Sequence, residues 1–155
     1  MVFKVKLFPK GHSLHPTQFF KNYDFQTVTI HWTGNQYGQT PSVVYDWWLK
    51  QNNGIGAHFV IKDEHCLQCV PTHAIVAHCG SATGNRTSIG IEVIPENAAG
   101  KFSEKSIKTI KELLSLYPPK HIVRHYDWSG KDCPKNYIDN AAWEKLKLAI
   151  TPDSW

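Results

Sequence analysis

The sequence lacks any long apolar run. Hydrophobic residues make up 41% of its 155 residues, yet no stretch approaches the roughly 20 apolar residues that a membrane helix requires. The opening residues 1–7 alternate charged and hydrophobic side chains and do not build the apolar core of a signal peptide. We therefore expect a protein that is synthesised in the cytoplasm without a signal peptide and that has no membrane partner.

A strong charge of either sign is also lacking. The formal net charge is +4 at pH 7, and the lysines are scattered along the chain without forming a stripe. This pattern argues against nucleic acid as a partner, but a mildly positive protein can still be attracted to an anionic polymer such as a bacterial cell wall. The length and the absence of an internal repeat predict one compact domain, and we expect a monomer.

A disulfide framework is not expected either. Without an export signal, Cys66, Cys69, Cys79 and Cys133 should be reduced. The spacing of Cys66 and Cys69 is that of many zinc and redox motifs. However, residues three apart on a strand point to opposite faces, and no second Cys-x-x-Cys follows. We interpret this pair as small buried apolar side chains.

Hydrophobic periodicity is what the sequence does contain. It predicts strands at 27–32, 58–62, 66–70, 88–94 and 122–124, and helices at 41–50, 103–117 and from Asn140 to about 150. Strands that alternate with helices, plus one hairpin, predict an α/β fold: a single domain with a central mixed sheet flanked by helices. We expect an irregular arm at 1–26, the folded domain at 27–150 and a tail at 151–155 that could be the start of a linker. Residues 81–86 read as a polar loop, and Trp47 and Trp48 as core aromatics, with sugar stacking as the alternative.

Three residues have the chemistry and position of metal ligands. His31 ends the β-branched run 27–30, His125 follows the apolar pair Ile122 and Val123, and Cys133 comes after a loop rich in Asp, Ser and Gly. Imidazole and thiolate are good zinc donors, and two His with one Cys leave one tetrahedral position for water or substrate. This favours a catalytic zinc site. A structural site would need a fourth protein ligand, for which Asp127, Asp132 and His78 are the near candidates.

Glu92 and His58 are the other candidates within predicted strands. Glu92 is the one acidic residue in the apolar run 88–94. Burying a carboxylate there costs free energy unless it is paired with a cation or takes part in catalysis. His58 starts a strand and could face the metal, although a buried histidine with a backbone partner is the commoner arrangement.

Several of these segments together resemble a known enzyme family. His31, the strand from His58, residues 77–80, residues 85–92 and residues 125–134 resemble the zinc-dependent N-acetylmuramoyl-L-alanine amidases of bacteriophages and bacteria, the type-2 amidases. That family shares its fold with peptidoglycan-recognition proteins, and the resemblance covers about residues 25–150, which would make 27–150 the catalytic domain.

The resemblance implies roles for particular residues. It assigns zinc to His31, His125 and Cys133, and it matches Lys131 to a lysine that several relatives have near the metal. Some members place a tyrosine where this sequence has Ala57, whereas others use a glutamate that corresponds to Glu92. The implied reaction cleaves the amide between N-acetylmuramic acid and the L-alanine of the peptidoglycan stem peptide.

The chemistry of such a site can be written from the residues. Zinc lowers the pKa of bound water toward about 7, and Glu92 would take a proton from that water and pass it to the leaving amine. Lys131 or a protonated His78 would stabilise the oxyanion, although either could instead be an ordinary loop residue. The lack of a signal peptide favours an endolysin that reaches the wall after the membrane is breached. A non-catalytic peptidoglycan-binding module and a zinc-stabilised structural domain remain as alternatives.

Overall fold

The structure is a computed structural model that describes residues 1–21, 27–34 and 36–155. Six strands form one sheet in the order β1-β4-β3-β5-β2-β6. The strands are β1 (Val2–Val5), β2 (Thr27–Trp32), β3 (Phe59–Lys62), β4 (His65–Gln68), β5 (Ser88–Val93) and β6 (His121–Arg124). The helices are α1 (Pro41–Gln51), α2 (Ala82–Thr87), α3 (Glu104–Leu116), α4 (His125–Ser129), the 3-10 turn η1 (Lys135–Tyr137) and α5 (Asn140–Ile150).

The sheet is mixed, as predicted. Strands β3, β5, β2 and β6 are parallel neighbours, whereas β4 is antiparallel to β3 in the expected hairpin. His31 on β2 is in register with Glu92 on β5. Because neighbouring residues in register point to the same face of a sheet, the strand pairing places these two side chains on one face.

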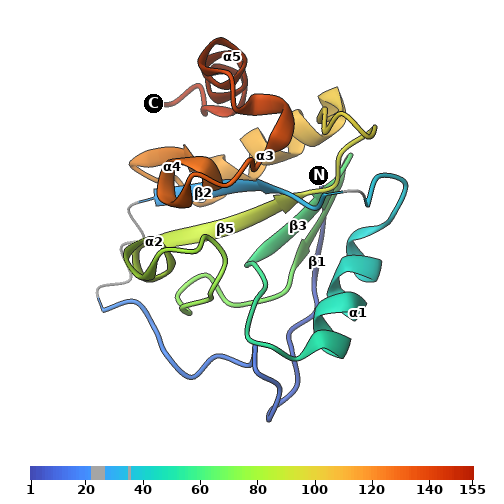
Figure 1. Ribbon diagram of the computed structural model, residues 1–155, viewed down its shortest axis with the longest axis vertical. Coiled ribbons are helices and arrows are strands. Elements are labelled where there is room, and N and C mark those ends of the chain that lie inside the picture. The colour runs from blue at the N-terminus through green and yellow to red at the C-terminus, as the bar shows by residue number, and fades with distance from the viewer. Residues whose placement is uncertain (22–26, 35) are drawn as a thin grey trace.

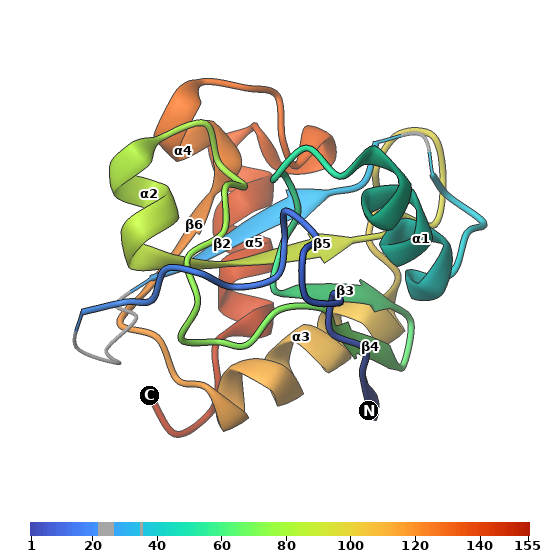
Figure 2. The same cartoon turned by 90° about the horizontal axis from the view of Figure 1, so that it is seen from below.

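Each face of the sheet has its own apolar core. In Figure 1, α3 and α5 lie above the sheet and α1 lies below it, and Figure 2 shows the same layers from a second direction. Alternate residues of the strands, such as Val28 and Ile30, pack under α3 and α5. Val44, Tyr45 and Trp48 of α1 pack on the other face together with residues of the N-terminal arm. The helix α1 covers this second face only in part, and His31 of β2 and Glu92 of β5 line the part that it leaves open.

Local signals placed the long helices correctly. Pro41 occupies the start of α1, and the helix ends at Asn52, which adopts the left-handed conformation (φ 47°). The Ser103 side chain caps α3 by accepting a hydrogen bond from the Ser106 backbone N–H. The Asp139 side chain caps α5 by accepting a hydrogen bond from the Ala142 backbone N–H.

Several predictions of local structure were wrong. Residues 2–5 of the expected irregular arm form β1, whose residues are all exposed and therefore show no buried face in the sequence. Residues 22–26, at the end of that arm, lie outside the described residues. The expected loop at 81–86 is the short helix α2, and residues 125–129 form α4. Gly84, normally unfavourable in a helix, fits here because a Cβ at this position would lie 2.5 Å from Cys79 Sγ and 2.8 Å from the Trp128 ring.

Two predictions about single side chains had different outcomes. Cys66 and Cys69 do face opposite sides of the sheet, because one belongs to the core under α3 and the other to the core under α1, and both are free thiols. Trp48 is buried as expected, but Trp47 is half exposed. No helix among the described residues is long and apolar enough to cross a membrane.

Candidate metal centre and cleft

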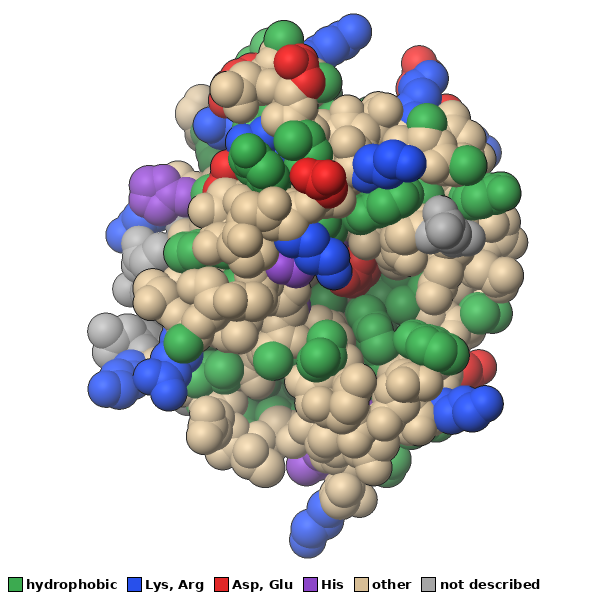
Figure 3. Space-filling view, in the orientation of Figure 1, with side chains coloured by type: hydrophobic (Ala, Val, Ile, Leu, Met, Phe, Trp, Pro, Cys, Tyr) green, Lys and Arg blue, Asp and Glu red, His purple; other side chains and the backbone are tan. Residues whose placement is uncertain are grey.

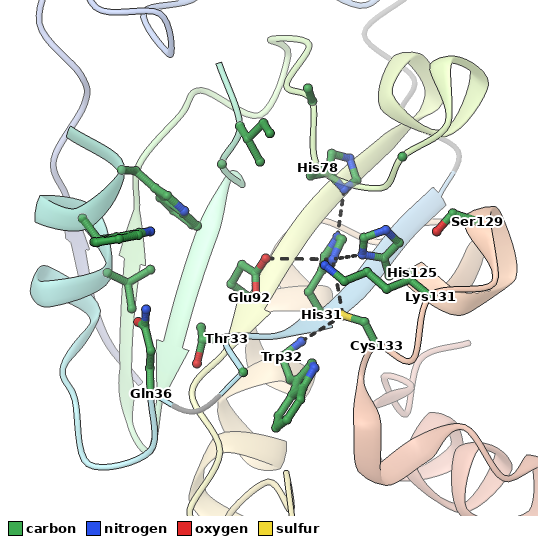
Figure 4. A pocket seen from close by; sticks show the side chains of 18 of the residues that line it. His31, Trp32, Thr33, Gln36, His78, Glu92, His125, Ser129, Lys131 and Cys133 are labelled. Atoms are coloured by element: carbon green, nitrogen blue, oxygen red, sulfur yellow. Dashed lines mark hydrogen bonds and ion pairs between the residues drawn. The ribbon is translucent and has the colours of Figure 1, made fainter. Parts of the chain in front are cut away.

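The three predicted metal ligands meet at one point. His31 lies near the carboxyl end of β2, His125 begins α4 directly after β6, and Cys133 lies in the loop that follows α4. Their ligand atoms all lie within 4.8 Å of one another, and all three residues are buried (Figure 4). Because β2 and β6 are parallel neighbours, their carboxyl ends lie at the same edge of the sheet, which is where α/β proteins place their sites.

The distances from His31 to the other two donors are close to those that a tetrahedral zinc ion sets between its ligands. With ordinary bond lengths, zinc sets its ligands about 3.3 Å apart for two nitrogens and about 3.6 Å apart for nitrogen and sulfur. Here His31 Nδ1 lies 3.1 Å from His125 Nδ1 and 3.8 Å from Cys133 Sγ. The Trp32 backbone N–H also donates to Cys133 Sγ at 3.4 Å, a contact that stabilises a thiolate. The residues present therefore fit a divalent metal of this type.

A hydrogen-bond chain fixes the tautomer of His31. The Ser88 backbone carbonyl only accepts hydrogen bonds, so His78 Nε2, 3.1 Å away, carries a proton. His78 Nδ1 is then unprotonated and accepts from His31 Nε2 at 2.9 Å. As a result, His31 Nδ1 carries a lone pair, which is directed at the metal-binding atoms of His125 and Cys133. Gly90 leaves room for this arrangement, since a Cβ there would lie 2.9 Å from the His78 ring.

The histidines of the site are neutral. Burial, followed by the neighbouring His78, lowers the pKa of His31 well below its usual value, and burial and Lys131 lower that of His125. Burial also lowers the pKa of His78 to about 3. A neutral His78 cannot supply the positive charge that the sequence analysis considered for it. Its observed contacts are with His31 and Ser88.

Burial also keeps the acidic groups of the site protonated when no cation is near. It raises the pKa of Cys133 to about 12, an effect that Glu92 reinforces. It raises the pKa of Glu92 to about 8, although Lys131 acts in the opposite direction. Glu92 Oε1 lies 3.9 Å from His31 Nδ1, and Oε2 is buried with no hydrogen-bond partner among the described residues. Glu92 is thus beside the metal ligands without being one of them.

The other candidate ligands are used elsewhere. His58 is fully buried, donates from Nε2 to the Ala74 carbonyl at 2.8 Å, and accepts from the Gly90 N–H at 3.0 Å. Asp127 is paired with Arg124, and Asp132 is exposed at the rim of the cleft. Within the described part of the chain, the metal-binding group therefore has three members.

A cleft of about 800 Å³ opens beside these ligands. Figure 3 shows it as a hollow in which histidine, acidic and basic side chains meet a hydrophobic wall. One side is polar and carries Ser129, Lys131 and Asp132, and Figure 4 shows Lys131 extending toward His31. The opposite side is apolar and comes from α1 and the segment after it, with Trp47 and Ile55 both at least half exposed.

Sequence reasoning missed two polar residues of this cleft. Thr33 Oγ1 and Gln36 Oε1 line it, and each is buried without a hydrogen-bond partner among the described residues (Figure 4). Their position just after the strand that carries His31 was a usable signal, because residues that follow parallel strands line such sites. Trp47 was identified but interpreted as core. It lies four residues after the exposed Val43, on a stripe of α1 separate from the buried Val44 and Trp48.

Sequence comparisons identify relatives that match this arrangement. A family model described as N-acetylmuramoyl-L-alanine amidase matches residues 21–136. N-acetylmuramoyl-L-alanine amidase CwlA of Bacillus subtilis (strain 168) is 32% identical over 133 residues, which are 79% of this chain and 48% of CwlA. N-acetylmuramoyl-L-alanine amidase XlyA of the same strain is 31% identical over 131 residues, which are 79% of this chain and 43% of XlyA. The chain thus spans about half the length of the curated relatives it matches.

Solved structures share the fold over nearly the whole chain. A mutant endolysin from Bacillus subtilis superposes with a TM-score of 0.79 at 30% identity, covering 97% of this chain and 99% of the other. The catalytic domain of XlyA gives a TM-score of 0.80 at 28% identity, with the same coverage. PlyL, at 22% identity and a TM-score of 0.80, shows the likeness of the fold alone.

Proposed function

Since the chain belongs to the N-acetylmuramoyl-L-alanine amidase family, we propose that it is a zinc-dependent hydrolase of the amide between N-acetylmuramic acid and L-alanine in bacterial peptidoglycan. The observation that carries this proposal is the meeting of His31, His125 and Cys133 beside Glu92 in one open cleft. The curated relatives bear the name of this activity. Structural neighbours are titled endolysins, which supports a role in lysis of the wall.

The chain's own residues would divide the work of hydrolysis. His31, His125 and Cys133 would hold zinc, which when bound acts as a Lewis acid on water and on the amide carbonyl. Glu92 accepts the proton of the attacking water and returns it to the nitrogen of the leaving amine. Burial raises its pKa to about 8, and bound zinc beside it would lower that pKa, because a nearby cation favours the carboxylate that accepts the proton.

The charge that develops on the carbonyl oxygen needs a stabilising cation. Lys131 extends into the cleft and acts electrostatically on His31, His125, Cys133 and Glu92. We assign the oxyanion to Lys131 and not to His78, because the latter is neutral and already hydrogen-bonded at both ring nitrogens. His78 instead orients His31, as outer residues of metal sites generally do.

The two sides of the cleft suggest how the substrate lies. In Figure 4, Glu92 stands between the metal ligands and the side that carries Thr33 and Gln36, whereas Lys131 comes from the opposite side. Glu92 protonates the leaving amine, so the stem peptide would leave toward Thr33 and Gln36. Their oxygens can accept hydrogen bonds from N–H groups of that peptide. Leaving a buried oxygen without a hydrogen-bond partner costs about 1–3 kcal/mol, and binding of the peptide would remove this cost.

Digestion of purified peptidoglycan tests the proposed activity. We expect new amino termini and no new reducing ends, and we expect the chelated enzyme to be inactive. Glu92→Gln should lower the rate by about 10²- to 10⁴-fold, the usual contribution of a general acid–base, and His31→Ala and Cys133→Ser should also lose most activity. Glu96→Gln is the matched control, because Glu96 is a partly exposed carboxylate paired with the exposed Lys101.

The possible outcomes separate the proposal from its alternatives. Reducing ends would identify a glycosidase, and full activity of Glu92→Gln would remove the proposed base. A non-catalytic peptidoglycan-binding module would sediment with the wall and release neither kind of end. All variants should have the far-UV circular dichroism of the parent, so that lost activity reports chemistry and not unfolding.

A further inference from the structure

Arg124 is a buried cation that the reaction does not use. It is the last residue of β6, directly before His125, and its side chain is 6% exposed. Its Nε and Nη2 atoms donate to the two carboxylate oxygens of Asp127 at 3.1 and 2.8 Å. Such bidentate pairs are stronger and more directional than a single hydrogen bond to a charge.

The remaining donors of Arg124 reach a distant part of the chain. Its Nη1 donates to the backbone carbonyls of Tyr137 and Ile138 at 3.1 and 2.8 Å. The guanidinium also lies 5.0 Å from the Tyr126 ring and 5.3 Å from the ring of Trp143 on α5. A charge with these partners is compensated, whereas removal of the Asp127 carboxylate would leave a buried charge without its ion-pair partner.

These contacts enclose the segment that carries two of the three metal ligands. At its beginning, Asp127 Oδ2 also accepts from the Arg124 backbone N–H at 2.7 Å, which fixes the first turn of α4 and therefore His125. At its end, the carbonyls of Tyr137 and Ile138 lie just after Cys133. Within the segment, the Tyr126 N–H donates to the Cys133 carbonyl at 2.9 Å. Arg124 thus connects both ends of the loop whose spacing decides the distance from His125 to Cys133.

We propose that Arg124 is a positioning residue for the metal centre. By bridging Asp127 to the 137–138 backbone, it holds His125 and Cys133, whose ligand atoms lie within 4.8 Å of each other, near enough to share one metal ion before zinc arrives. This inference rests on the proposed zinc site but not on the identity of the substrate. A lysine cannot replace this arginine, because one ammonium group does not have the planar set of donors that reaches Asp127 and the two carbonyls together.

Metal affinity separates this role from a purely structural one. A residue that only stabilises the fold lowers the free energy of unfolding without changing how tightly the folded protein binds zinc. A residue that positions the ligands changes zinc affinity in protein that is still folded. Outer residues of metal sites typically contribute 10- to 100-fold to affinity.

The experiment measures zinc affinity by competition with a chelator for the parent, Arg124→Lys and Asp127→Asn, at a temperature where each is folded by circular dichroism. We expect both variants to bind zinc about 10- to 100-fold more weakly than the parent. The double variant should be no weaker than the weaker single variant, because both residues belong to one contact. The absorption bands of the cobalt-substituted variants should shift, because they report the geometry of the Cys133 and histidine ligands.

A matched control removes packing without touching the loop. Leu113→Ala deletes a side chain from the core under α3, where Leu113 is 1% exposed, and it should destabilise the fold while leaving zinc affinity within about twofold of the parent. Parent-like zinc affinity and an unchanged cobalt spectrum in Arg124→Lys and Asp127→Asn would overturn the proposal. Amidase activity of the parent is measured separately, so a parent that binds zinc but does not hydrolyse the amide would overturn the proposed function alone. A parent that binds no zinc would overturn both.

Discussion

Lys131 shows how one exposed residue can act on a buried site. Its backbone is at the surface, yet its ammonium group extends over the cleft, and its charge lowers the pKa of His31, His125, Cys133 and Glu92. Those effects have one sign because a cation favours every deprotonated form around it. The same charge would favour the negative oxygen that forms during amide hydrolysis.

Replacing Lys131 by methionine tests this role. We expect Lys131→Met to lower kcat by about 10²- to 10³-fold, the usual cost of losing one oxyanion partner, and to leave zinc content at one ion per chain. Lys131→Arg should recover part of the rate because it restores the charge. Lys120→Met, at an exposed position before β6, is the control. A Lys131→Met enzyme with parental kcat would show that Lys131 is an ordinary loop residue.

At the scale of elements, α1 has two apolar stripes with different purposes. Val44, Tyr45 and Trp48 pack on the sheet, whereas Trp47 is 50% exposed and lines the cleft. Trp47 and Ile55 both line the cleft and are both at least half exposed, so together they form an apolar surface that is not used for packing in the core. Under the proposed function, this wall binds part of the peptidoglycan strand while Glu92 and the metal ligands act on the amide.

The wall predicts a binding defect without a chemical one. We expect Trp47→Ala to raise KM for peptidoglycan about 5- to 10-fold, with kcat within twofold, because a lost aromatic contact is worth about 1 kcal/mol. The KM of Trp47→Phe should lie between those of the parent and Trp47→Ala. Leu148→Ala, which removes a 79% exposed side chain from α5, should leave both constants unchanged. An unchanged KM in Trp47→Ala would exclude this wall from substrate binding.

For the whole molecule, we expect the fold to form without the metal. The two apolar cores lie on opposite faces of the sheet and are built from apolar side chains other than the three metal-binding residues. The ligands thus lie at one edge of the sheet, outside the two apolar cores.

Removal of the metal should therefore abolish activity and leave the fold. We expect a chelator to eliminate hydrolysis while the far-UV circular dichroism is retained. The free energy of unfolding should fall only by the free energy that zinc binding contributes. Added zinc should restore activity. Loss of secondary structure on chelation would instead identify a zinc-stabilised structural domain.

The buried histidines should make the metal-free protein sensitive to acid. Burial lowers the pKa of His58 to about 4, against an ordinary value of 6.5, although its hydrogen bond to Ala74 acts in the opposite direction. Between these values the unfolded chain binds the proton and the folded protein does not. The stability that is present above pH 6.5 is therefore lost as the pH falls toward 4, by up to about 1.4 kcal/mol per pH unit for this group.

Urea unfolding of the metal-free protein at several pH values between 4.5 and 7.5 measures this slope. His58→Gln can still donate to the Ala74 carbonyl and accept from the Gly90 N–H, but it cannot titrate. The slope of the unfolding free energy against pH gives the number of protons taken up on unfolding. We expect this number to be lower in His58→Gln than in the parent, by up to one. An equal slope in both proteins would show that His58 is protonated in the folded state as readily as in the unfolded chain.

Features that depend on neighbours along the chain could be predicted from the sequence. Alternation predicted β2, β5 and β6, and with them His31 and His125 at strand ends and Glu92 within a strand of a mixed sheet; the parallel pairing that brings them to one edge came from the structure. Strand propensity, helix caps and the donor chemistry of histidine and cysteine are local properties. The ligand set could therefore be predicted before any contact was known.

Features that depend on residues remote in sequence could be found only in the folded molecule. Burial lowers the pKa of His78 and keeps it neutral, its two ring nitrogens contact Ser88 and His31, and Asp127 is paired with Arg124. The strand β1 has no buried face, and Trp47 is exposed because the sheet takes up only the other stripe of α1. No pattern along the chain contains these facts, because burial, pairing and the pKa of a side chain are set by the groups that folding brings to it.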